Sequence, residues 1–219
     1  LVGIAMGVIE AGMCQTVAIF RSMNGHSQTR IGGTGARAAA PVINEFLHER
    51  SYGWQSAGQK FALAFMRHMH DFGTTPEQVA HVKVAHSHHA SNNPKAYYKQ
   101  RVTVEDVINS RMICKPLHLL DCCVETDNAT AIIVTSAERA KDMPQIPALI
   151  RGVVGRVSKP RADLYYEAGP ISTVAGYYAG PRLWRNAGLG PEEVDVTGSY
   201  DAFTFTTMLQ LEDYGFCKK

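Results

Sequence analysis

The stretch Gly198–Thr204, GSYDAFT, joins a predicted strand to a predicted helix near the end of the chain. Residues 193–197 before it, EVDVT, alternate polar and apolar side chains, which is typical of a half-buried strand. From Phe203 to Tyr214, apolar side chains recur at near-helical spacing, and Gly215 suits the position just after a helix. Helical and strand-like segments also alternate along the rest of the chain, and this order predicts an α/β fold.

Tyr200 and Asp201 lie at the carboxyl end of this predicted strand, where the helix begins. In α/β sheets, ligands bind at that edge, and the N–H groups of a helix start favour negative charge. A tyrosine hydroxyl beside a carboxylate is therefore a candidate acid/base pair. In the alternative interpretation, Asp201 caps the helix and Tyr200 is a core residue. Both interpretations remain open, and spacing alone favours the second.

Composition and charge are those of an ordinary soluble globular protein. A chain of 219 residues with 45% hydrophobic and 19% charged residues has room for one or two domains and a substantial core. The net charge of +2 and the lack of a dense basic run speak against a nucleic-acid partner, and no apolar run is long enough to span a membrane. The five cysteines, at positions 14, 114, 122, 123 and 217, show no CxxC pair or disulfide-framework spacing, so we expect a cytoplasmic protein.

Capping residues and periodicity predict the other elements. Gly73 ends one helix, and Thr75, Pro76 and Gln78 suit the N-cap, first and third positions of the next. Because no initiator methionine or cap precedes Leu1 and the chain stops just after a helix, we expect a fragment that lacks sequence on both sides. Helices are expected over 1–12, 56–70, 76–89, 103–106, 136–141 and 181–188, and strands over 15–21, 129–135 (buried) and 148–157.

Polar residues cluster in and after the helix expected over 76–89. Its histidines form no convergent triad with a carboxylate, so we predict no metal site. The loop that follows either lines a polar pocket or forms an Asn-Pro turn with surface tyrosines, and spacing alone favours the turn. A glycine cluster at 32–35, GGTG, is either a phosphate cradle or a loop, and the loop is favoured because no strand-to-helix pattern surrounds it. The histidines are His81, His86, His88 and His89, and the loop carries Asn92, Asn93, Tyr97 and Tyr98.

Motifs that recur together in one family lie in four stretches. Residues 1–23 form a helix-strand segment, His89–Pro94 has the sequence HASNNP, residues 116–129 begin PLHLLDCC and end TDNA, and Tyr200–Phe203 has the sequence YDAF. Together they resemble the thiolase superfamily, in its sterol-carrier and lipid-transfer-protein branch, over essentially the whole chain. HASNNP is similar to the branch's His-x-x-Asn-Asn-Pro motif, and residues 116–129 are similar to its proline-leucine, cysteine and threonine/serine-aspartate-glycine signature. YDAF stands in the place of Asn-Glu-Ala-Phe or His-Asp-Cys-Phe.

The resemblance implies a thiolase-like layered α/β/α fold with an inserted helical loop region. Residues 1–135 would then be the latter part of the N-terminal domain, including the loop region at about 24–115, and residues 136–219 the first part of the C-terminal domain. Thiolases are generally dimers through a sheet edge, so the resemblance also implies a homodimer with the strand at Thr16–Phe20 in its interface.

Tyr200 departs from ordinary thiolases, which have Asn or His at this place. Together with the loop at Asn92–Tyr97, it looks like the steroid side-chain aldolases of the superfamily. Those enzymes cleave a β-hydroxyacyl-CoA by a retro-aldol reaction without a nucleophilic cysteine, and they pair with a small OB-fold acyl-CoA-binding protein. The resemblance implies a coenzyme A thioester as substrate, no bound cofactor, and Tyr200, Tyr97 and Asp201 as catalytic residues, with Asp201 as a cap or orienter. The substrate-binding residues that it implies are His89, Asn92 and Asn93.

Two other functions remain open. In a cysteine-dependent thiolase, which works by acyl transfer, the nucleophile loop would precede Leu1 and the histidine- and glycine-rich motifs would follow Lys219. None of the five cysteines stands at the nucleophile's position. In the third possibility, the chain is a non-catalytic acyl-CoA or lipid carrier that retains the fold.

Overall fold

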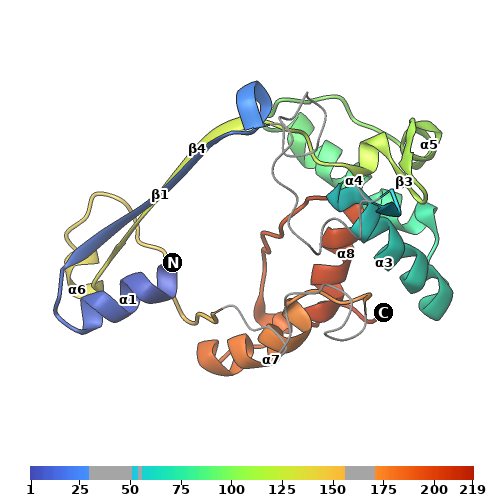
Figure 1. Ribbon diagram of the computed structural model, residues 1–219. Helices are drawn as coiled ribbons and strands as arrows, with labels where there is room; N and C mark the ends of the chain where they lie inside the picture. Colours follow the sequence, from blue (N-terminus) through green and yellow to red (C-terminus); the bar gives the residue numbers. More distant parts are fainter. Residues whose placement is uncertain (30–50, 54–55, 156–170) are drawn as a thin grey trace.

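The computed structural model describes residues 1–29, 51–53, 56–155 and 171–219. A two-stranded ribbon runs from a small group of helices near the N-terminus to a larger helical body, and the predicted α/β class is confirmed (Figure 1). In chain order, the elements are α1 Val2–Glu10, β1 Thr16–Asn24, the π turn η1 Gly25–Thr29, α3 Ala57–Phe72, α4 Pro76–Ser91, α5 Val104–Asn109, β2 Met112–Cys114, β3 Leu117–His118, the 3-10 turn η2 Leu119–Asp121, β4 Asp127–Thr135, α6 Ala137–Ala140, α7 Gly176–Ala187, the 3-10 turn η3 Pro191–Glu193, and α8 Thr204–Asp213.

Local capping signals set the ends of the helices where the sequence places them. Thr75 Oγ1 accepts the Gln78 N–H, and Gln78 Oε1 accepts the Thr75 N–H, so both donors at the start of α4 are satisfied. Such a cap stabilises a helix by about 1 kcal/mol. Gly73 ends α3 with a φ of 72°, and Gly215 follows α8 with a φ of 89°. A side chain is rarely tolerated at these backbone angles, so glycine suits both positions.

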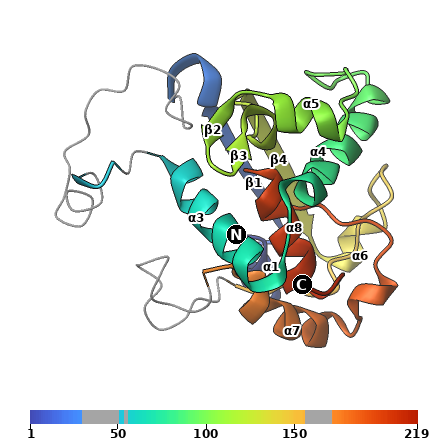
Figure 2. The same cartoon turned by 90° about the vertical axis from the view of Figure 1, so that its right-hand side faces the viewer.

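The helical body has one hydrophobic core. Phe65 of α3 stacks on Phe205 of α8 with ring centroids 4.6 Å apart, and both side chains are buried. Val79, Leu117 and Leu209 complete the buried centre, so α4 and β3 pack against the same two helices. Burying side chains of this size stabilises a fold by roughly 1.5–3 kcal/mol each. Figure 2 shows α8 in the middle of the body with α3, α4 and α7 around it, so α8 is held firmly.

The ribbon pairs two strands that are far apart in the sequence. β1 and β4 run antiparallel in continuous register, from Thr16 opposite Thr135 to Asn24 opposite Asp127. The prediction of a buried strand over 129–135 is wrong in one respect: the strand is present, but of its apolar side chains only Val134 is buried. Among the described residues, no further strand pairs with the ribbon, and helix α1 contacts it near one end.

Two predicted strands are not formed. Residues 193–197 continue from η3 as an extended but unpaired segment, with Val196 87% exposed. A strand requires a neighbour that accepts and donates its backbone hydrogen bonds, and no described strand lies beside this segment. Residues 148–155 are irregular for the same reason, while residues 156–157 lie outside the described ranges.

Other predictions differ in extent or fall outside the described residues. The helix predicted over 181–188 begins earlier, at Gly176, with Pro181 inside α7. The glycine cluster at 32–35 lies outside the described residues, and the domain boundary between 135 and 136 stays a prediction. None of the helices in the described ranges combines the length and apolar character needed to cross a bilayer.

Candidate functional site

Two motifs that are distant in the sequence meet at the start of α8. Cys122 and Phe203 form an isolated antiparallel bridge, and the Cys123 N–H donates to the Ala202 carbonyl oxygen at 3.1 Å. The PLHLLDCC stretch therefore lies directly alongside the YDAF stretch. This contact joins two of the motifs singled out in the sequence analysis.

The buried carboxylate of Asp121 holds these two stretches together. Asp121 is 5% exposed, and its Oδ1 accepts the Thr204 hydroxyl at 2.6 Å while its Oδ2 accepts the His118 N–H at 2.8 Å. Hydrogen bonds to a carboxylate are among the stronger ones in proteins. Asp121 therefore ties Thr204, the first residue of α8 and the residue directly after the YDAF stretch, to strand β3.

Tyr200 and Asp201 both face solvent. Tyr200 is 76% exposed, so the interpretation as a core tyrosine is wrong. The prediction of Asp201 as the N-cap is wrong as well, because α8 begins at Thr204 with Phe203 as its N-cap. The Phe203 N–H donates to Thr206 Oγ1 at 3.1 Å, so a residue inside the helix satisfies the donor at this end. The phenol of Tyr200 is therefore not part of the core, and the carboxylate of Asp201 does not cap α8.

The loop after α4 forms the Asn-Pro turn that spacing favoured. Asn92 is the C-cap of α4, and Asn93 Oδ1 accepts the Lys95 N–H at 3.0 Å. His89 is exposed on the last turn of the helix. Tyr97 is 76% exposed and meets the edge of Tyr98 with ring centroids 4.8 Å apart.

The structure places the predicted site residues on two neighbouring elements. Tyr200 and Asp201 lie just before α8, and His89, Asn92 and Asn93 lie at the end of α4, which packs against α8. Within the described part of the chain, no hydrogen bond or ring contact joins Tyr97 to Tyr200.

Neither cysteine beside YDAF is prepared for nucleophilic attack. Burial, together with the adjacent Asp121 carboxylate, raises the pKa of the Cys122 thiol to about 11. Partial burial and then the Asp201 carboxylate raise the pKa of the Cys123 thiol. Reactive cysteines have lowered pKa values because the thiolate is the nucleophile. A catalytic role for either thiol is therefore not supported.

Alkylation of Cys122 is expected to be slow at neutral pH. A thiol with a pKa of about 11 is ionised in roughly one molecule in a thousand near pH 8, so iodoacetamide should modify it about a hundredfold more slowly than an ordinary cysteine. The rate should rise as the pH approaches 11. Mass spectrometry after timed labelling at several pH values measures this, with a cysteine-containing reference peptide in the same tube. A labelling midpoint near pH 8 for Cys122 would contradict the expectation.

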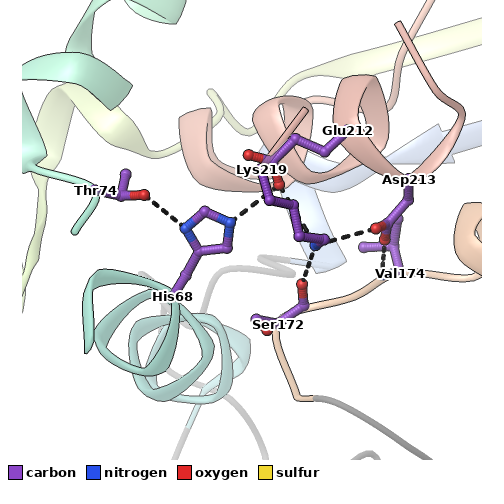
Figure 3. Close-up of polar contacts among 7 residues, drawn as sticks. All are labelled: His68, Thr74, Ser172, Val174, Glu212, Asp213 and Lys219. Carbon is purple, nitrogen blue, oxygen red and sulfur yellow. Dashed lines mark hydrogen bonds and ion pairs between the residues drawn. The ribbon is translucent and has the colours of Figure 1, made fainter. Parts of the chain in front are cut away.

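A second polar cluster, which sequence reasoning missed, lies at the other end of α8 (Figure 3). His68 of α3 is 1% exposed, and its ring nitrogens lie 2.8 Å from Thr74 Oγ1 and 3.0 Å from Glu212 Oε2. Because both nitrogens are engaged and the ring is buried, no nitrogen remains for a substrate. His68 and Glu212 are 144 positions apart, so no local pattern could have indicated the pair.

Lys219 extends the same cluster to the segment before α7. Its ammonium group lies 3.1 Å from Asp213 Oδ1 and donates to the Ser172 carbonyl oxygen at 2.7 Å. Asp213 also accepts the Val174 N–H. Burial raises the pKa of Asp213, while the Val174 N–H and Lys219 act in the opposite direction. The cluster joins α3, α8 and residues 172–174, which is a structural role.

The TDNA motif also has a structural role in the described chain. Asp127 Oδ1 accepts the N–H groups of His26 and Ser27 at 2.9 and 3.0 Å, which holds the turn η1 against the end of the ribbon. These hydrogen bonds, that from Ser27 foremost, lower the pKa of Asp127. Among the described residues, no group of three or more histidine, cysteine or acidic side chains is arranged to hold a metal ion.

Comparison with known proteins supports the resemblance seen in the motifs. Residues 164–219 match the family model described as Thiolase C-terminal domain-like. The chain is 37% identical over 219 residues to the 17-hydroxy-3-oxo-4-pregnene-20-carboxyl-CoA lyase of Mycobacterium tuberculosis. It is 34% identical over 220 residues to the steroid side-chain-cleaving aldolase of Thermomonospora curvata. Each match covers 96% of this chain and 56% of the relative, so the chain spans little more than half of their length.

A solved structure shows the same fold. The chain superposes on the structure named Ltp2-ChsH2(DUF35) aldolase with a TM-score of 0.88 and 34% sequence identity, over 100% of this chain and 56% of that one. The thiolase-like layered fold expected from the motifs is thereby confirmed. The chain belongs to the thiolase superfamily, in its sterol-carrier and lipid-transfer-protein branch.

Proposed function

We propose that this chain provides the tyrosine-bearing part of an acyl-CoA aldolase, which cleaves a carbon–carbon bond in a steroid whose side chain is a β-hydroxyacyl-CoA thioester. The observation that carries the proposal is the Tyr200 phenol, which is exposed to solvent beside the start of α8. Two relatives of at least 34% identity are named as a lyase and an aldolase of such compounds. The raised pKa values of Cys122 and Cys123 support a reaction in which neither is the nucleophile.

The proposed chemistry is a retro-aldol cleavage. A base takes the proton of the β-hydroxyl group, the carbon–carbon bond breaks, and a ketone or aldehyde leaves. The electron pair of the broken bond goes to the thioester as an enolate, which then takes a proton at carbon. We assign acid/base roles to Tyr200 and Tyr97, with Asp201 as an orienting carboxylate. The substrate-binding residues in this proposal are His89, Asn92 and Asn93, at the end of α4.

Product analysis of the complete protein tests this function. A steroid whose side chain is a β-hydroxyacyl-CoA thioester should give one ketone or aldehyde and one shortened acyl-CoA in equal amounts, without added coenzyme A. Mass spectrometry of both products measures the ratio. Cleavage of a β-ketoacyl-CoA that needs free coenzyme A would instead indicate a thiolase, and binding without turnover would indicate a carrier.

The proposal includes partners. The related structure pairs an aldolase with a DUF35 protein according to its name, and we propose a small OB-fold acyl-CoA-binding partner for this chain as well. We further propose a homodimer with Thr16–Phe20 in its interface, since Phe20 is 77% exposed on β1. Sedimentation velocity of the complete protein, alone and with such a partner, tests both assemblies; a monomer would contradict the dimer.

A further inference from the structure

One side chain binds both backbone polar groups of Tyr200. Gln210 Oε1 accepts the Tyr200 N–H at 3.0 Å, and Gln210 Nε2 donates to the Tyr200 carbonyl oxygen at 2.6 Å. The second hydrogen of the same nitrogen is donated to the Thr206 carbonyl oxygen at 2.9 Å, within α8. The carboxamide therefore presents to Tyr200 the same donor and acceptor that a neighbouring strand would present.

The two hydrogen bonds between Gln210 and the Tyr200 backbone, here called the Gln210 clamp, stand in for strand pairing at the end of residues 194–200. Residues 194–200 pair with no described strand, and Tyr200 is 76% exposed. Within the described part of the chain, the hydrogen bonds that hold the Tyr200 backbone are the two to Gln210. The position of the phenol thus depends on α8, which is anchored by the buried side chains of Phe205 and Leu209.

We infer that Gln210 is a positioning residue, which sets where Tyr200 presents its hydroxyl group to the substrate. The inference rests on the proposed role of Tyr200. Gln210 itself acts through the main chain, because its oxygen accepts the Tyr200 N–H and both hydrogens of its nitrogen are donated, to Tyr200 and Thr206. A misplacement of a reacting group by about 1 Å can reduce a rate by up to a hundredfold, so loss of the clamp acts on turnover more than on binding.

The substitution Gln210→Met in the complete protein tests this role. Methionine has similar length and cannot bind the Tyr200 peptide groups, so kcat should fall by about tenfold while KM stays within about twofold. Gln78→Met is the matched control, because it also removes a glutamine that binds a backbone N–H, at the start of α4. The control should keep kcat within about twofold of wild type.

A double substitution separates this inference from the proposed function. If Gln210 acts through Tyr200, then Gln210→Met should add less than about twofold to the loss caused by Tyr200→Phe. A large loss in Tyr200→Phe with unchanged kcat in Gln210→Met overturns the inference alone. Unchanged kcat in Tyr200→Phe overturns the proposed role of the tyrosine.

Amide hydrogen exchange tests the clamp without an activity assay. In the wild type, the Tyr200 N–H should exchange at least about tenfold more slowly than the Asp201 N–H, because Gln210 accepts the former. This difference should disappear in Gln210→Met and persist in Gln78→Met. Equal exchange of the two amides in the wild type overturns the inference, even if the variant does not fold.

Discussion

Tyr200→Phe in the complete protein is expected to lower kcat by about a hundredfold or more, which is the usual loss when a positioned acid/base group is removed. The substitution takes away one hydroxyl group and leaves the ring. Acyl-CoA affinity should change little, because the proton transfer contributes in the transition state and not in the bound ground state. Tyr200 is 76% exposed, so the melting temperature should also be unchanged. Turnover, ligand affinity and thermal melting of the same preparation measure the three quantities.

Tyr177→Phe provides the matched control for this experiment. Tyr177 lies on α7, is 49% exposed, and has no proposed part in the reaction. Its replacement should leave kcat as in wild type. Tyr97→Phe in the same assay tests the second proposed acid/base group. Turnover of Tyr200→Phe within about threefold of the Tyr177→Phe control would contradict the aldolase mechanism proposed for Tyr200.

Asp121→Ala is expected to lower the free energy of unfolding by about 3 kcal/mol, and to lower kcat as well. The carboxylate is 5% exposed and accepts one hydrogen bond from Thr204 and one from the His118 backbone. Hydrogen bonds to charged groups contribute about 1.5–3 kcal/mol each, and the buried donors left without a partner add to the loss. The start of α8 would lose its link to β3, so the YDAF stretch would be less well placed. Chemical denaturation and steady-state kinetics measure the two effects.

Asp106→Ala makes the same chemical change on the surface. Asp106 accepts hydrogen bonds from the N–H and hydroxyl groups of Thr103 at the start of α5, but its carboxylate is exposed. Its loss should affect stability much less than the loss of Asp121, and it should not affect kcat. Asp121→Asn keeps the shape of the side chain and should fall between wild type and Asp121→Ala. Equal free energies of unfolding for Asp121→Ala and Asp106→Ala would show that Asp121 does not hold the start of α8 to β3.

Local signals in the sequence determined most helix ends and the family. Thr75 with Gln78, and Gly73 at the preceding helix end, act through hydrogen bonds and backbone angles within a few residues, so they can be recognised from spacing. The alternation of helical and strand-like segments indicated the α/β class. The HASNNP and YDAF motifs, together with residues 116–129, indicated the thiolase superfamily and drew attention to Tyr200.

Tertiary contacts decided what these local signals do not contain. Residues 193–197 have the alternation of a strand, but a strand forms only where a neighbour completes its hydrogen bonds, and no described strand lies beside them. Three residues later, Gln210 of α8 binds the backbone of Tyr200. Asp121 meets Thr204 across 83 positions and His68 meets Glu212 across 144. Such pairs depend on how helices pack, because the energy of a buried polar group is set by the partner that the fold brings to it. The sequence therefore indicates Tyr200 as a candidate site residue, whereas only the tertiary structure shows which groups hold it in position.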